Sequence, residues 1–130
     1  MGMPAGIKII DCMLGIPEAE DRSNWFDPFR PLIKDAQTLQ QFAMPAQYMF
    51  KDIPQTGKQD DYIKWTVDQM DRFNVEKALV GWNDDDTSRR AKELYPDRFF
   101  FDVPCDPNKG VEEVRRIKRL HSEVGISAIS

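Results

Sequence analysis

The run Lys77-Ala78-Leu79-Val80-Gly81-Trp82 decides the fold class of this chain. It is short and apolar and shows little alternation, which is typical of a strand covered on both faces. Apolar residues recur at helical spacing before it, from Gln59 to Asn74, and after it, from about Thr87 to Tyr95. A strand between two helices indicates a βαβ unit and therefore a parallel sheet.

The same alternation continues to the end of the chain. Phe99-Phe100-Phe101-Asp102-Val103 predicts another strand, a helix is predicted from about Gly110 to Val124, and Ile126 to Ser130 begins a further strand. Asn74 and Gly125 suit helix ends, because both residue types adopt left-handed backbone. The apolar stripe predicted for the last helix consists of Val111, Val114, Ile117, Leu120 and Val124.

The chain opens with the apolar stretch Ile7-Lys8-Ile9-Ile10-Asp11-Cys12-Met13-Leu14-Gly15, a predicted strand that ends in an acid. The segment 16–58 that follows is interrupted by prolines, which exclude a long helix or a central strand. Its aromatic and methionine residues would expose too much apolar surface for a simple linker. We therefore expect a packed lid, with a short helix from Asp35 to Phe42, and one partial barrel domain over 1–130: strand 7–15, lid 16–58, βα repeats 59–130.

Composition narrows the functional classes. The chain has 130 residues, enough for one domain with a core, and 41% hydrophobic and 31% charged residues are ordinary for a globular protein. A net charge of −4 with scattered basic residues gives no indication of nucleic-acid binding. No apolar run approaches the roughly 20 residues of a membrane span, and no signal peptide is evident. Two cysteines suit reduced thiols, so we expect a cytoplasmic protein. From the charge and the apolar runs we expect no nucleic-acid or membrane partners.

Four strands and three helices correspond to about half of a (β/α)₈ barrel, which typically takes about 250 residues. Three explanations stay open. The chain is the amino-terminal part of a longer protein, which we expect, or a complete four-stranded open sheet, or one of two copies that together form eight strands. The last explanation would make the protein a homo-oligomer.

An ordered set of stretches resembles the decarboxylase-like (amidohydrolase-related) branch of the amidohydrolase superfamily. It consists of Ile9-Ile10-Asp11, Met70-Asp71-Arg72-Phe73-Asn74-Val75-Glu76-Lys77-Ala78, Ala91-Lys92-Glu93-Leu94-Tyr95-Pro96-Asp97-Arg98-Phe99 and Val103-Pro104-Cys105-Asp106-Pro107. The resemblance covers roughly 8–130 apart from the lid. It implies an α/β fold, the amino-terminal half of a TIM-like (β/α)₈ barrel, with a long lid after the first strand.

The resemblance also implies a divalent metal, usually zinc, that polarises the substrate or activates water. In the family the first strand continues as Asp-x-His-x-His, and the two histidines bind the metal. Here Met13 and Gly15 occupy the histidine positions. Glycine has no side chain and a thioether is a poor ligand for such a cation, so this sequence does not support the ordinary metal site. The family's further ligands come from later strands, beyond Ser130.

Four residues at predicted strand ends are candidates for chemistry. Asp11 is a candidate metal ligand or acid–base group, or it accepts hydrogen bonds from loop amides. Asp102 is a candidate catalytic acid at the active face of such a barrel. Trp82 and Asp106 are candidates for substrate binding, although core packing is the default for Trp82 and Asp106-Pro107 is equally a turn signature.

Three further features have weaker functional interpretations. The run Asp84-Asp85-Asp86 could bind a cation, but it also suits a turn into a helix N-terminus. Cys105 has no basic neighbour in the sequence to lower its pKa, which argues against a nucleophilic role. His121, the only histidine, is predicted on the outside of the barrel, so no Ser-His or Cys-His relay can form within this chain.

Two functions remain. The first is an amidohydrolase-like hydrolase or decarboxylase that acts on a small carboxylated or aromatic substrate, with an altered or absent metal site. The second is a non-catalytic relative that binds a ligand or serves as a subunit of an assembly. Met13 and Gly15 favour the second, while the lid and the strand-end acids favour the first.

Overall fold

The computed structural model describes residues 6–17, 27–41 and 57–130, which form two units. One unit contains Met1–Pro17 and Asp61–Ser130, and the other contains Glu18–Asp60.

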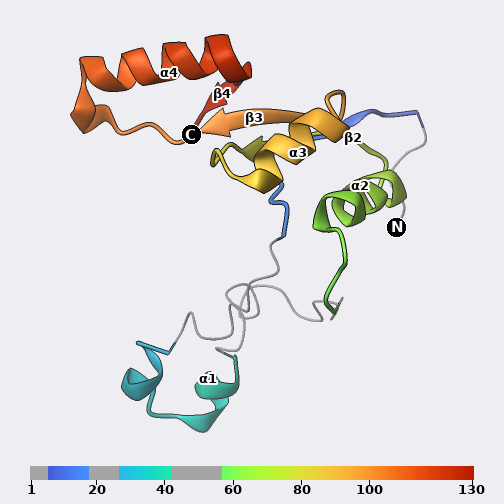
Figure 1. The fold of residues 1–130 in the computed structure, drawn as a ribbon. Helices are drawn as coiled ribbons and strands as arrows, with labels where there is room; N and C mark the ends of the chain where they lie inside the picture. The colour runs from blue at the N-terminus through green and yellow to red at the C-terminus, as the bar shows by residue number, and fades with distance from the viewer. Residues whose placement is uncertain (1–5, 18–26, 42–56) are drawn as a thin grey trace. The chain divides into compact units, whose positions relative to one another are not determined.

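The larger unit is built on a curled four-stranded parallel sheet that forms a half-barrel (Figure 1). Its strands are β1 (Ile9–Asp11), β2 (Val75–Gly81), β3 (Phe99–Val103) and β4 (Ala128–Ile129), in the order β1-β2-β3-β4. All three neighbouring pairs are parallel. The predicted α/β class with a parallel sheet is therefore confirmed.

The two outer strands are shorter than the predicted stretches 7–15 and 126–130. The register of β1 is irregular between Ile9 and Ile10, and a turn at Asp11 ends the strand. β4 pairs with Asp102 and Val103, the last two residues of β3, so little ladder is left for it.

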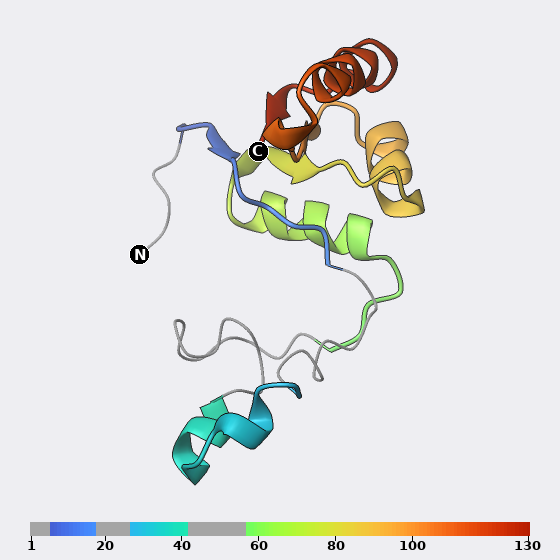
Figure 2. The ribbon, with the colours of Figure 1, turned by 90° about the vertical axis from the view of Figure 1, so that its left-hand side faces the viewer.

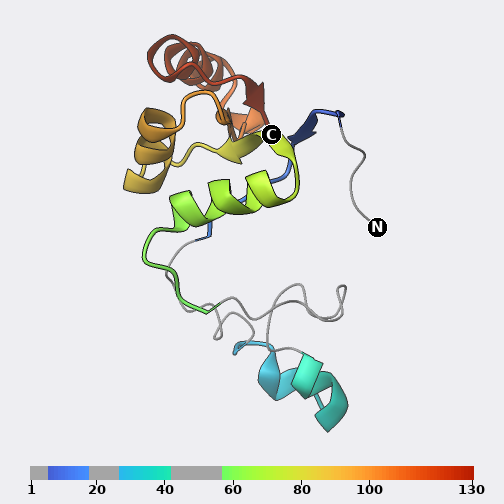
Figure 3. The same cartoon turned by 90° about the vertical axis from the view of Figure 1, so that its right-hand side faces the viewer.

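A helix precedes each of the strands β2, β3 and β4. These helices are α2 (Tyr62–Arg72), α3 (Asp86–Leu94) and α4 (Val111–Val124), and they follow one another along the sheet in Figures 2 and 3. Asp61 caps α2 by accepting hydrogen bonds from the amides of Ile63 and Lys64. The predicted left-handed residues are confirmed at the ends of α2 and α4, with φ of 59° at Asn74 and 78° at Gly125.

The core lies between the helices and one face of the sheet, which we call the covered face. Alternate strand residues supply it, since successive side chains of a strand point to opposite faces. The buried apolar residues are Ile63, Val67, Met70, Ala78, Val80, Trp82, Ala91, Phe99, Phe101, Val103 and Ile126.

The opposite face, which we call the open face, carries the other strand residues. Lys77 and Gly81 are exposed there, and Leu79, Phe100 and Asp102 are half-buried. The prediction that the second strand is covered on both faces is therefore wrong.

The predicted apolar stripe of α4 is only partly buried. Ile117, Leu120 and Val124 pack against the core, whereas Val111 and Val114 are exposed. The buried residue of the first turn is instead Glu113, whose carboxylate is paired as described below.

The smaller unit contains a short 3₁₀ helix, η1 (Arg30–Leu32), and the helix α1 (Ala36–Gln41). The Asp35 carboxylate accepts a 2.7 Å hydrogen bond from the amide of Thr38. The short helix predicted here is thus confirmed, although Phe42 lies outside the described residues. Most aromatic residues on which the lid prediction depends also lie outside them, so the lid stays a prediction.

Candidate functional site

The carboxyl ends of the four strands gather at one edge of the half-barrel, because parallel strands all end on the same side. We call this the carboxyl edge. Backbone hydrogen bonds connect neighbouring strand ends there, and the amide of Ser130 donates one of them to the Val103 carbonyl at 3.0 Å. The amide of Trp82 donates to the Asp102 carbonyl at 2.8 Å, and the amide of Cys105 donates to the Ser130 carbonyl at 2.9 Å.

Asp102 lies on the open face near this edge. In the strand register it stands between Gly81 of β2 and Ala128 of β4. Its Oδ1 atom would lie 4.0 Å from a Cβ placed on Gly81, so its side chain extends over the space that glycine leaves. The half-buried carboxylate is therefore flanked by the two smallest residue types, and bulky neighbours do not cover it on either side.

Asp11 ends β1, and its carboxylate binds the loop that follows. Its Oδ1 atom accepts a 2.9 Å hydrogen bond from the amide of Met13, two residues further along. This is the loop hydrogen bond of the structural alternative for Asp11. Met13 itself is 95% exposed, and a Cβ placed on Gly15 would have no atom within 4 Å.

Trp82 is 8% exposed and lies on the covered face. Its ring meets Phe101 edge to face at 5.3 Å between centroids, and Lys92 Nζ lies 6.0 Å from its centroid. The indole Nε1 is buried without a hydrogen-bond partner. The structure thus places Trp82 behind the sheet, in the packing role, and not beside Asp102.

Asp106 begins the 3₁₀ helix η2 (Pro107–Lys109) that follows β3. Its Oδ1 atom accepts hydrogen bonds from the amide of Asn108 at 3.0 Å and from Asn108 Nδ2 at 3.1 Å. The carboxylate therefore forms the turn that Asp106-Pro107 predicted. The backbone amide of Asp106 donates to Glu113 Oε1 at 3.3 Å.

The acidic run after β2 forms the start of α3. Asp85 caps the helix by accepting a 2.7 Å hydrogen bond from the amide of Ser88, and the hydrogen bonds from Ser88 lower the pKa of Asp85. Asp84 pairs with Arg89 at 2.8 Å, and Asp86 lies 4.0 Å from Arg90. Each carboxylate has its own local partner, as expected of a helix start.

Sequence reasoning missed an ion pair beside the carboxyl edge, in which Glu113 is buried and Arg116 is half-buried. Glu113 in the first turn of α4 is 3% exposed, and Arg116 donates to its Oε1 atom from Nε at 3.0 Å and from Nη2 at 2.5 Å. The hydrogen bond from Arg116 lowers the pKa of Glu113, and the same bond raises the pKa of Arg116. The signal was available, because Glu at the third position of a helix often reaches back to the preceding loop.

The structure also gives the positions of Cys105 and His121. Cys105 is exposed and follows Pro104, whose carbonyl accepts a hydrogen bond from Arg116. His121 lies on α4, and its Nδ1 atom is 2.9 Å from the carbonyl of Ile126, to which a protonated Nδ1 donates. His121 therefore joins α4 to the segment before β4.

The donor set does not fit the metal that the resemblance implies. Within residues 6–17, 27–41 and 57–130, no three histidine, cysteine, aspartate or glutamate side chains come together as a metal site. Met13 offers a thioether and Gly15 offers no side chain. We derive no chemical step through a metal.

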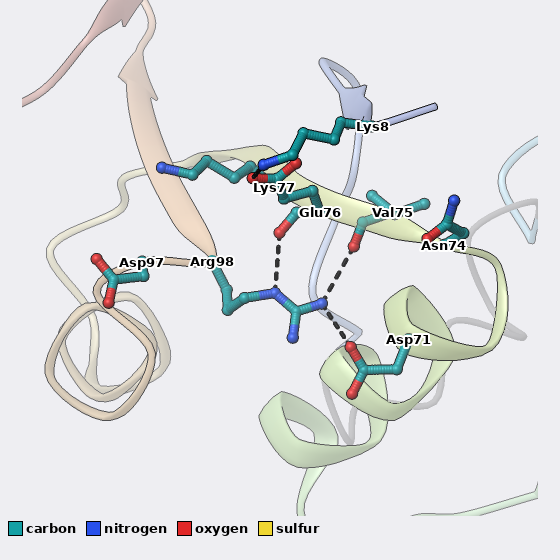
Figure 4. Close-up of a pocket in the computed structure, with 8 residues that line it drawn as sticks. All are labelled: Lys8, Asp71, Asn74, Val75, Glu76, Lys77, Asp97 and Arg98. Atoms are coloured by element: carbon teal, nitrogen blue, oxygen red, sulfur yellow. Dashed lines mark hydrogen bonds and ion pairs between the residues drawn. The ribbon is translucent and has the colours of Figure 1, made fainter. Parts of the chain in front are cut away.

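A cavity of about 690 Å³ lies at the amino end of the sheet (Figure 4). Arg98 occupies its centre and donates to the carbonyl of Glu76 at 2.9 Å and to that of Val75 at 3.1 Å. Its Nη2 atom also pairs with Asp71 at 2.7 Å. These contacts fasten α2 and the loop before β3 to the start of β2, which is a structural role, in keeping with the amino face of such sheets.

No protein-family model matches the chain, and no match was found among curated proteins or among solved structures. None of the helices formed by the described residues has the length and apolarity needed to cross a bilayer.

Proposed function

We propose that this protein is an amidohydrolase-like hydrolase or decarboxylase and that its half-barrel is the amino-terminal half of a TIM-like barrel. The sequential order of four parallel strands supports this, because that order is the one a (β/α)₈ barrel uses. The substrate would be a small carboxylated or aromatic molecule held at the carboxyl edge.

Asp102 carries the proposal. It is a half-buried acid on the open face, near the carboxyl edge, with Gly81 and Ala128 as its cross-strand neighbours. A carboxylate with room beside it can exchange a proton with a bound molecule. We therefore assign Asp102 the acid–base role, whereas Asp11 and Asp106 shape the adjoining loops and Trp82 supports the sheet from behind.

The test measures turnover of a panel of benzoate and short dicarboxylate compounds by wild type and by Asp102→Asn. We expect turnover of at least one compound by wild type and a loss of about a hundredfold or more in the variant. Asp97→Asn is the matched control, because Asp97 is an exposed acid at the amino end of the sheet. Equal activity in Asp102→Asn and wild type would remove Asp102 from the reaction.

A non-catalytic relative is the second candidate, and a specific observation favours it. Three acids, Asp11, Asp85 and Asp106, already accept hydrogen bonds from nearby backbone amides. These acids therefore have a structural role at the carboxyl edge. In that case the same compounds would bind without being converted. Binding seen by chemical-shift changes with no product formed would support this candidate.

Metal analysis of the purified protein also distinguishes the enzyme from the non-catalytic relative. Less than about a tenth of an equivalent of bound metal would exclude the ordinary zinc mechanism of the family. Restoring histidine at Met13 and Gly15 extends the test, since a variant that still binds no zinc would lack the remaining ligands as well.

A further inference from the structure

Two residues of α4 form hydrogen bonds with the connection from β3 to α4. Arg116 Nη2 donates to the carbonyl of Pro104 at 2.5 Å, and Glu113 Oε1 accepts from the amide of Asp106 at 3.3 Å. Between them, the amide of Cys105 donates to Ser130. Each residue of the segment 104–106 therefore has a backbone hydrogen bond, from Pro104 and Asp106 to α4 and from Cys105 to the residue after β4.

The helix start explains why Glu113 is needed. The N-cap residue is Gly110, with φ of 54° and no side chain to cap the helix. Glu113, at the third helical position, reaches back to the loop in the manner of a capping box, but to an amide seven residues before it. A buried carboxylate is unfavourable unless it is paired and hydrogen-bonded. Arg116 supplies that pairing and at the same time holds Pro104.

We propose that Glu113 and Arg116 are positioning residues that hold the segment 104–106 in one conformation beside Asp102, so that this wall of the substrate site keeps its shape. Asp102 precedes the segment by two residues, and neither Glu113 nor Arg116 needs to touch the substrate. The inference rests on the proposed function only in treating the carboxyl edge as the substrate site. The conformation itself can be tested without any ligand.

The first test is amide hydrogen exchange by NMR on Glu113→Gln, with Glu112→Gln as the matched control. Both substitutions remove one negative charge from the first turn of α4, so their effect on the helix dipole is alike. Of the two glutamates, Glu113 is the one that accepts a hydrogen bond from the loop. We expect protection of the Asp106 amide to fall about tenfold or more in Glu113→Gln and to stay unchanged in Glu112→Gln. Equal protection in the two variants would overturn the inference.

A pH profile distinguishes positioning from general stability. The groups that face Glu113 are Arg116 on the same helix, Lys109 on η2 and the Asp106 amide, and Arg116 also interacts with Cys105. In Arg116→Gln the carboxyl loses its main stabilising partner and protonates at higher pH. As the pH falls, protection of Asp106 should then be lost at a higher pH in Arg116→Gln than in wild type. Identical profiles would contradict the role of Arg116.

Binding of sodium benzoate connects the pair to the site. We expect its Kd to rise about tenfold in Glu113→Gln and to stay unchanged in Glu112→Gln. If Glu113→Gln does not fold, Arg116→Lys takes its place, because lysine keeps the charge but not the fork that reaches Pro104. If wild type binds neither benzoate nor the other carboxylates, the proposed function fails, while the exchange measurements still decide the positioning role. Benzoate binding that is equal in both variants would overturn the link to the site.

Discussion

The two faces of the half-barrel sheet differ in how closely their side chains are packed. On the covered face of β3, Phe99, Phe101 and Val103 are all buried against the helices. On the open face of the same strand, Phe100 and Asp102 are half-buried. One strand therefore shows both environments at adjacent positions, which allows stability and ligand binding to be separated by neighbouring substitutions.

Phe101→Ala and Phe100→Ala give the largest contrast. Phe101 is 3% exposed and contacts Trp82, so its truncation leaves a cavity and should lower the free energy of unfolding by about 3–5 kcal/mol. Phe100 is partly solvated already, and we expect less than half that loss. Urea unfolding followed by circular dichroism measures both. Equal losses would mean that the open face is as tightly packed as the covered one.

The N-terminus of α3, a helix that packs on the covered face, gives the next largest expected change in stability. Asp85→Ala removes the cap of α3 and should cost about 1 kcal/mol, whereas Asp86→Ala, one residue on, should change stability little. The folded-state pKa of Asp85 is lowered, so its contribution is complete above the unfolded pKa of about 3.9 and is lost as the pH falls through the folded value. The difference between wild type and Asp85→Ala should therefore shrink below about pH 4. A difference that stays constant as the pH falls to the acid limit of the folded protein would contradict the cap.

Trp82→Phe distinguishes packing from binding on the covered face. The substitution removes volume, but it also removes the buried Nε1 that lacks a partner. These effects oppose each other, so we expect a net change within about 1 kcal/mol. Benzoate affinity should not change, because the ring lies behind the sheet. A large loss of affinity with unchanged stability would return Trp82 to the substrate site.

The main elements could be predicted because each depends on local signals. Periodic apolar residues predicted α2, α3 and α4, and the left-handed residues Asn74 and Gly125 predicted two helix ends. These signals act within a few residues and do not require the rest of the fold.

The placement of individual side chains could not be predicted as well. Whether Trp82 faces the helices or the substrate depends on strand register, since a shift of one residue moves a side chain to the other face. The pair of Glu113 with Arg116 depends on where the loop after β3 passes α4. The contacts of Arg98 with β2 likewise join residues far apart in the sequence. Arg98 lies 22 residues after Glu76 and 23 residues after Val75.

Asp102→Asn should change stability least and function most. The substitution keeps the size of the side chain, and the neighbours Gly81 and Ala128 make no polar side-chain contact with it, so we expect a change within about 0.5 kcal/mol. Removing the charge should nevertheless lower turnover of a bound carboxylate compound about a hundredfold or more. Urea unfolding and turnover measured on the same preparation decide the matter. If stability falls sharply while turnover per folded molecule is kept, Asp102 belongs to the packing of the open face, and the functional difference between the two faces disappears.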